Sequence, residues 1–144
     1  MHDVGKSQID LGILNKRGPL NDEEWEYIKK HPDRGVKLLS QTQLVSSTSL
    51  KVVRQHHEKC SGRGYPLGLK EQDIHFFAKI AAIADVFDAL TTDRPYKSAM
   101  NAYPAIAMMQ AEMQDDLNFQ LLHELVFLLN TEHDYTELRS QACS

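Results

Sequence analysis

The sequence predicts an all-α protein that folds as a single domain. Apolar residues recur at helical spacing along most of the chain, and no segment of useful length alternates as a strand does. A length of 144 residues suits one domain, and 42% hydrophobic residues are enough to bury a core. Only 7 Gly and 5 Pro are present and 25% of the residues are charged, which excludes the disordered and fibrous classes.

Composition also limits the partners and the location that we expect. The 16 Lys and Arg against 20 Asp and Glu give a net charge of −4, which argues against a general coat for DNA or RNA. No apolar run approaches the roughly 20 residues that span a bilayer, and no signal peptide precedes the polar start. Cys60 and Cys143 are too few for a disulfide framework, so we expect a cytoplasmic protein.

Capping residues predict where the helices of the first half begin. Asn21 is expected to cap a helix with Glu24 three residues on, as in a capping box. The pair His31-Pro32 starts a second helix, because proline is tolerated in the first helical turn. Residues 41–49 are polar and predict a loop, and a helix is expected from about Leu50 to Glu58.

The second half of the chain predicts an ordered loop and three helices. Residues 60–69 are rich in glycine and hold Pro66, which is typical of a loop. Helices are expected over 75–90, 104–114 and 119–129, and the polar residues 131–144 are expected to fray. The buried face of the first of these helices is predicted to consist of Ile80, Ile83, Ala84, Phe87 and Leu90.

Residues that could bind a metal ion occur at four places: His2-Asp3, His31, His56-His57 and Asp85. Imidazole and carboxylate groups together suit Mn, Fe or Zn. Each place also has a purely structural interpretation, since a histidine at a helix end often caps it and an aspartate in an apolar helix often accepts a hydrogen bond. The residue types alone leave the metal site and the structural roles open as equal alternatives.

Longer strings of residues resemble one known family. In chain order they are His2-Asp3-Val4-Gly5-Lys6, Ile13-Leu14-Asn15-Lys16-Arg17-Gly18-Pro19-Leu20, His31-Pro32-Asp33-Arg34-Gly35, His56-His57-Glu58, Gly62-Arg63-Gly64-Tyr65-Pro66, Ala84-Asp85-Val86-Phe87-Asp88-Ala89-Leu90 and Asp93-Arg94-Pro95-Tyr96-Lys97. Their order and spacing over about residues 1–129 resemble the HD-GYP family, a branch of the HD-domain metal-dependent phosphohydrolases that cleaves cyclic di-GMP. The resemblance implies a single HD-domain bundle of about five to seven helices over residues 1–130.

The resemblance implies a role for each matching residue. Two or three divalent ions, with Fe or Mn favoured, would be bound by His2, Asp3, His31, His56, His57 and Asp85. Asp3 would bridge two of the ions, and the catalytic residues would be His2, Asp3 and Lys6. The substrate would be contacted by Lys6, Arg94 and Lys97 at its phosphate and by Tyr65 on the guanine side. Two ions activate water and hold phosphate oxygens, and cationic side chains bind the remaining phosphate charge.

Two departures from the family pattern alter these expectations. Ser61 stands where the family has an aspartate in the loop, and a hydroxyl can still cap the turn. Met1 directly precedes His2, where the family has one or two further helices and another His or Glu ligand. We therefore expect a chain that lacks the N-terminal helices, exposes apolar surface and covers it with a second copy or a partner.

Three functions are compatible with the sequence. The first is a bacterial signalling enzyme, a metal-dependent phosphodiesterase that hydrolyses cyclic di-GMP. The second is a family member of low activity that senses a ligand or docks signalling proteins such as diguanylate cyclases through the Gly-Tyr-Pro loop. The third, a general HD-type nucleotide phosphohydrolase, is disfavoured by that loop.

Overall fold

The structure, a computed structural model, describes residues 1–16, 18–93 and 98–142. Helices dominate these ranges, in which the one pairing of β type is an isolated bridge between Ser61 and Lys70. The prediction of an all-α fold is therefore confirmed. Over the same described ranges, no helix combines the length and the apolar character needed to cross a membrane.

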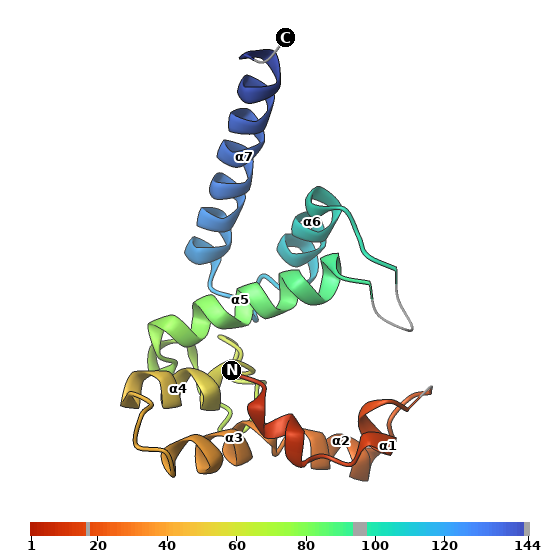
Figure 1. Cartoon of the computed structure of the whole chain (residues 1–144), viewed down its shortest axis with the longest axis vertical. Helices are drawn as coiled ribbons and strands as arrows, with labels where there is room; N and C mark the ends of the chain where they lie inside the picture. The colour runs from red at the N-terminus through yellow and green to blue at the C-terminus, as the bar shows by residue number, and fades with distance from the viewer. Residues whose placement is uncertain (17, 94–97, 143–144) are drawn as a thin grey trace.

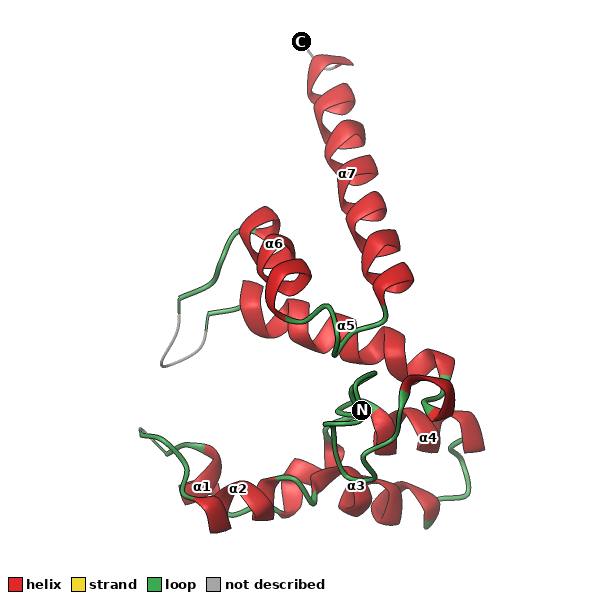
Figure 2. Cartoon of the chain, turned by 180° about the vertical axis from the view of Figure 1, so that it is seen from behind, coloured by secondary structure: helices red, strands yellow, loops and turns green. Residues whose placement is uncertain are grey.

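The helices follow one another with two short 3₁₀ helices among them (Figure 2). In chain order the elements are η1 (Val4–Gln8), α1 (Leu11–Leu14), α2 (Asp22–Ile28), α3 (His31–Ser40), α4 (Ser47–Gln55), η2 (Glu71–Asp73), α5 (Phe76–Thr91), α6 (Ala102–Glu112) and α7 (Phe119–Ala142).

Helix α5 lies across the middle of the molecule and links its two parts (Figure 1). On one side it packs on α4, which packs on α3, and α3 in turn packs on η1. On the other side α5 packs on α6 and α7, and α7 projects away from the rest of the chain. The N-terminus therefore lies next to the middle of the fold rather than at its edge.

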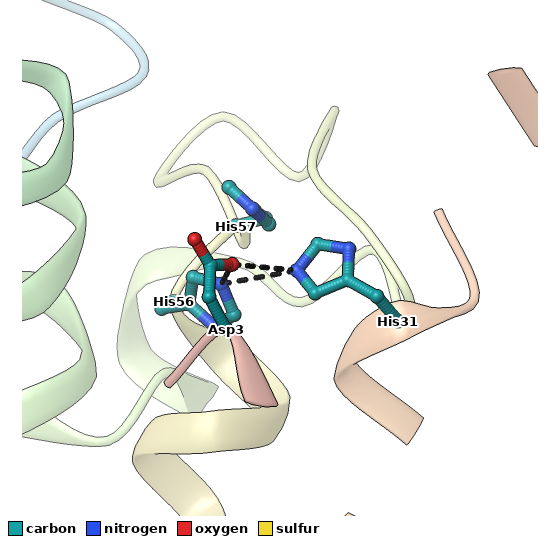
Figure 3. A group of neighbouring side chains, drawn as sticks. All are labelled: Asp3, His31, His56 and His57. Atoms are coloured by element: carbon teal, nitrogen blue, oxygen red, sulfur yellow. Dashed lines mark hydrogen bonds and ion pairs between the residues drawn. The ribbon is translucent and has the colours of Figure 1, made fainter. Parts of the chain in front are cut away.

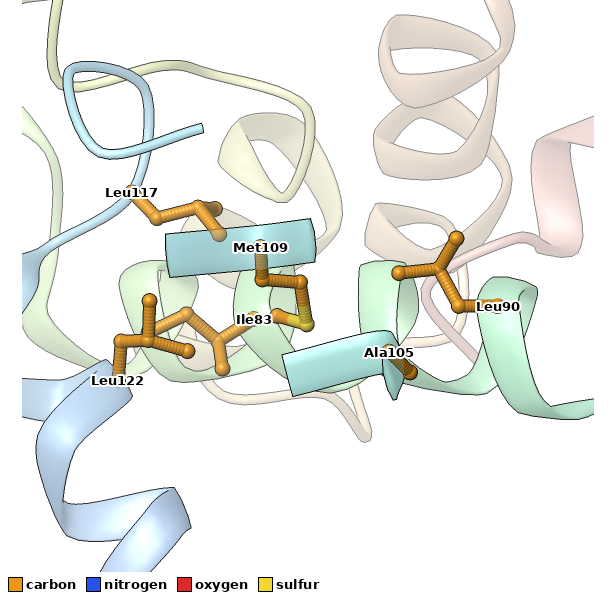
Figure 4. Close-up of a cluster of buried hydrophobic side chains, with 6 residues drawn as sticks. All are labelled: Ile83, Leu90, Ala105, Met109, Leu117 and Leu122. Carbon is orange, nitrogen blue, oxygen red and sulfur yellow. The ribbon is translucent and has the colours of Figure 1, made fainter. Parts of the chain in front are cut away.

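The main hydrophobic core lies where α5, α6 and α7 meet (Figure 4). Its buried members are Ile83, Leu90, Ala105, Met109, Leu117 and Leu122. Because α5 contributes to this core and also packs on α4, it fixes the two parts of the molecule relative to each other.

Local capping signals are confirmed in the first half of the chain. The Glu24 N–H donates to Asn21 Oδ1 at 2.8 Å, and the Asn21 N–H donates to Glu24 Oε2 at 2.8 Å, which completes the capping box. Helix α4 begins at Ser47 rather than near Leu50, because Ser46 caps it by accepting a hydrogen bond from the Ser49 N–H at 3.1 Å. The predicted loop over 41–49 is thus too long.

Two other expectations differ from the structure. Helix α7 continues to Ala142 instead of ending at Leu129, since neither proline nor glycine follows to interrupt its backbone hydrogen bonds. Ile80 and Ala84 are exposed rather than buried, because they line an open groove between α5 and α7. The placement of a domain boundary near residue 130 stays a prediction.

Gly5 permits the close approach of η1 to α3. A Cβ atom at Gly5 would overlap the backbone oxygen of His31 and would lie 2.6 Å from the backbone nitrogen of Gly35. The residue is buried in this contact. Glycine at this position therefore brings the segment that holds His2 and Asp3 against the start of α3.

We predict that Gly5→Ala lowers the free energy of unfolding by about 1–3 kcal/mol, because the added methyl group forces two backbones apart. Gly18→Ala is the matched control, since a Cβ atom there meets no described atom within 4 Å. Urea denaturation of both variants checks this prediction, which is wrong if both lose the same stability.

Candidate metal centre

Four segments bring their polar side chains together beside the N-terminus, and Figure 3 shows Asp3, His31, His56 and His57 from three of them. The turn before η1 carries His2 and Asp3, and the first residue of α3 is His31. The adjacent residues His56 and His57 follow the last turn of α4. The middle of α5 contributes Asp85.

Hydrogen bonds to backbone carbonyl groups fix the tautomer of two of the imidazole rings. His31 Nδ1 lies 2.9 Å from the carbonyl oxygen of Ile28, and His56 Nδ1 lies 2.9 Å from that of Val53. A carbonyl oxygen only accepts, so both Nδ1 atoms carry a proton. In the neutral rings, each Nε2 atom therefore presents a lone pair, as it does in histidines that bind metal.

These two lone pairs and one carboxylate oxygen point at one another. The two Nε2 atoms of His31 and His56 are 3.3 Å apart, and Asp3 Oδ1 lies 3.2 Å from the first and 3.5 Å from the second. Both rings are fully buried, and Asp3 Oδ1 is a buried atom without a hydrogen-bond partner among the described residues. Three facing acceptors repel one another unless a cation lies between them, so this donor set fits a divalent metal.

A second group of ligand atoms shares Asp3 with the first. His2 Nε2 lies 3.6 Å from Asp3 Oδ2 and 3.6 Å from Asp85 Oδ1. The two groups are Asp3-His31-His56-His57 and His2-Asp3-Asp85, and within each the ligand atoms lie within 4.8 Å of one another. The structure thus brings all six predicted ligands together in a cluster that could hold metal.

Burial and charge set the protonation of the cluster. Burial above all, with the positive charge of Lys6 in addition, lowers the pKa of His57 to about 3, so this ring is neutral at pH 7. For Asp3, burial tends to raise the pKa, but lowering contributions, which include the hydrogen bond and the charge of Lys6, outweigh it and hold the pKa well below its usual range. The Lys6 ammonium donates to Asp3 Oδ2 at 2.7 Å. His57 is therefore a neutral imidazole and Asp3 an ionised carboxylate, the forms that bind metal.

Tyr65 covers the cluster from the side of the glycine-rich loop. Its ring centroid lies 4.7 Å from that of His57 and 6.3 Å from that of His31. Burial, followed by the charges of Asp3 and Asp85, raises the pKa of the phenol above its usual range. The phenol is therefore protonated at neutral pH and can donate a hydrogen bond to a ligand.

Glu58 holds this loop, a role that the sequence did not reveal. The Glu58 side chain is buried, and its two carboxylate oxygens accept hydrogen bonds from the N–H groups of Leu67 and Leu69 at 2.6 and 2.8 Å. The Tyr65 N–H donates to the carbonyl oxygen of His57 at 3.2 Å. One residue next to the histidine pair thus positions the loop that carries Tyr65.

Asp116 secures the other side of the same loop and was also missed. It accepts hydrogen bonds from Lys59 at 2.7 Å, from the Ser61 hydroxyl at 2.6 Å and from Arg63 at 3.1 Å. The family's aspartate at position 61 would place a second carboxylate beside Asp116, whereas the serine found here donates to it. This contact spans 55 residues of sequence, so no local pattern could have indicated it.

Two predicted substrate contacts remain untested. Arg94 and Lys97 lie outside the described residues. The predicted contact residues that are described, Lys6 and Tyr65, both lie at the cluster.

Comparison with known proteins shows which family the chain resembles. A family profile described as HD domain matches residues 1–119. The chain is 42% identical over 109 residues to the cyclic di-GMP phosphodiesterase PA4108 of Pseudomonas aeruginosa, covering 76% of this chain and 26% of that protein. It is 33% identical over 139 residues to the 3′3′-cGAMP-specific phosphodiesterase 3 of Vibrio cholerae, covering 96% of this chain and 30% of that protein. The chain thus spans less than a third of the length of these relatives.

A solved structure has the same fold. Bd1817, an HDG"Y"P protein from Bdellovibrio bacteriovorus, superposes with a TM-score of 0.69 at 23% identity, covering 90% of this chain and 40% of that one.

We predict that Mn²⁺ stabilises this chain and that His31→Gln abolishes the effect, because His31 supplies one of the converging lone pairs. At a metal concentration about a hundredfold above its Kd, the gain should be about 2–3 kcal/mol. The measurement is thermal unfolding with and without Mn²⁺. His123→Gln, at an exposed histidine on α7, is the control and should keep the full gain. An equal gain in the parent chain and in His31→Gln would contradict the assignment.

We also predict a pH-dependent contribution from Asp116. Burial tends to raise its pKa, but its three hydrogen bonds outweigh this and lower the pKa from 3.8 to about 2. Its contribution is therefore present above the unfolded-state pKa and is lost as pH falls through the folded-state pKa. Parent and Asp116→Asn should differ in unfolding free energy by about 1–2 kcal/mol at neutral pH and converge toward about pH 2. Urea denaturation across this pH range measures the difference, and a difference in unfolding free energy that does not change with pH would contradict the prediction.

Proposed function

This chain belongs to the HD domain family, in its HD-GYP branch, and we propose that it is a metal-dependent phosphodiesterase that hydrolyses cyclic di-GMP. The observation that carries the proposal is the convergence of Asp3 Oδ1 with the Nε2 atoms of His31 and His56. Because cyclic di-GMP is a bacterial second messenger, the proposal places the reaction in the bacterial cytoplasm.

The donor set favours two divalent ions, with Fe or Mn as the metal. Asp3 faces one group of ligands through Oδ1 and the other through Oδ2, which suits a carboxylate that bridges two ions. Imidazole and carboxylate donors in these proportions suit Mn and Fe. When bound, such ions would supply hydroxide near neutral pH and neutralise phosphate charge.

The side chains of this protein would position the substrate and balance its charge. Lys6 lies beside Asp3, and its ammonium is placed to bind a phosphate oxygen. Arg94 and Lys97 would add charge at the phosphate, as the sequence strings imply. Tyr65 would contact the substrate next to the ligands through its protonated hydroxyl. The Gly-Tyr-Pro loop would in addition be the surface that docks signalling proteins such as diguanylate cyclases.

A second substrate, 3′3′-cGAMP, is favoured by one specific observation. A Vibrio cholerae relative named for that substrate is as similar to this chain as the cyclic di-GMP phosphodiesterase of Pseudomonas aeruginosa is, at 43% identity over 98 residues against 42% over 109 residues. Both substrates are cyclic dinucleotides with two phosphodiester bonds, so the same metal centre would serve either one.

We predict that Lys6→Met lowers kcat/KM for cyclic di-GMP about 10- to 100-fold with Mn²⁺ present, because one charge-assisted contact with phosphate is lost. Its metal content should be unchanged, whereas His56→Gln should lose both metal and activity. Lys51→Met, at an exposed lysine on α4, is the matched control and should behave like the parent chain.

The assay follows the linear product by chromatography, and 3′3′-cGAMP is run beside cyclic di-GMP. A parent chain that binds Mn²⁺ yet hydrolyses neither substrate would refute the phosphodiesterase proposal. In that case the ligand-sensing module would take its place.

A further inference from the structure

We propose that the exposed indole of Trp25, which Tyr65 contacts edge to face, is an aromatic platform on which a nucleobase of the bound substrate stacks. The inference rests on the proposed function and deepens it. It assigns to Trp25 the recognition of the base, whereas the metal cluster would bind the phosphate.

A row of aromatic rings leads from the metal cluster to the surface. The Tyr65 ring lies 4.7 Å from His57 with an interplanar angle of 31°. The Tyr65 ring also meets Trp25 edge to face, with the centroids 6.3 Å apart and an angle of 75°. Trp25 ends the row, and 45% of its surface is exposed.

The position of Trp25 is fixed by the local fold. Helix α2 is held at its start by the capping box, and only Lys29 and Lys30 separate its end from His31. The indole is thus anchored within a few residues of a predicted metal ligand. A large indole that stays half exposed at such a place is available to a ligand, since the hydrophobic effect otherwise favours its burial.

Ion pairs offset part of the acidic charge around the indole. Lys29 Nζ lies 6.0 Å from the centroid of the Trp25 ring. The helix also carries acidic residues, of which Glu24 is paired with Lys16 and Glu26 is paired with Lys29. These ion pairs reduce the repulsion that a dinucleotide would meet on approaching the ring.

Stacking on an indole requires an aromatic base but does not distinguish strongly between one base and another. Every nucleobase has a π face, so guanine and adenine gain similarly from an indole. The platform would therefore serve cyclic di-GMP and 3′3′-cGAMP alike, and it would disfavour phosphodiesters that carry no base.

Fluorescence tests the platform directly, because Trp25 is the single tryptophan of the chain. In a stopped-flow mixer, cyclic di-GMP should quench this emission saturably in the presence of Mn²⁺ before turnover. Dimethyl phosphate, a diester without a base, should not quench it at any concentration. Quenching without hydrolysis would support the platform and refute the phosphodiesterase proposal. Hydrolysis without quenching would do the reverse, and the absence of both would overturn both.

Variants give a second readout. Trp25→Leu should raise KM about 5- to 100-fold for cyclic di-GMP and for 3′3′-cGAMP, with the effect falling on KM rather than on kcat. Trp25→Phe should recover most of the loss, because it restores an aromatic face. Phe127→Leu, at an aromatic residue on α7 that is 59% exposed, is the control and should leave KM at the parent value. An unchanged KM in Trp25→Leu would overturn the inference.

Discussion

The contact between η1 and the start of α3 is the constraint on which the candidate site depends. Gly5 lies against the backbone of His31 with no room for a side chain, and this contact holds Asp3 within 3.2 Å of the His31 ring. Helix α4 packs on α3 and brings His56 to the same point. Three segments that are distant in sequence are thus fixed relative to one another by backbone packing. The polar groups do not have to draw the segments together.

The orientation of the two imidazole ligands follows from hydrogen bonds between their Nδ1 atoms and backbone carbonyl groups. The carbonyl groups of Ile28 and Val53 accept from the Nδ1 atoms of His31 and His56, so that each Nε2 lone pair faces the cluster. A site built in this way is preorganised for a cation and is electrostatically unfavourable without one. Hydrogen bonds also position the residues around the ligands, because the Glu58 carboxylate fixes the loop that carries Tyr65.

Local signals were sufficient to predict much of the fold from the sequence. The capping box of Asn21 and Glu24 acts over three residues, and the structure contains it as predicted. The start of α4 and the end of α7 were misplaced, because a serine cap and the absence of helix breakers are weaker signals than an apolar stripe. Ile80 was wrongly assigned to the core, since periodicity shows which face is apolar but not whether another helix covers it.

The candidate site was predictable only where the family resemblance assigned a role to a residue. His2, Asp3 and the other expected ligands do meet, as the family resemblance implied. Asp116 could not be recognised in the sequence, because its partners lie more than 50 residues away. The sequence did not single out Trp25 either, because only the fold shows that this residue lies half exposed beside Tyr65.

The position of bound metal tests the central claim most directly. Crystals of the chain grown with Mn²⁺ would be measured for anomalous scattering at the manganese absorption edge. We expect an anomalous manganese peak within about 2.0–2.5 Å of Asp3 Oδ1 and of the Nε2 atoms of His31 and His56. A manganese peak bound elsewhere, with these three atoms left without metal, would contradict it.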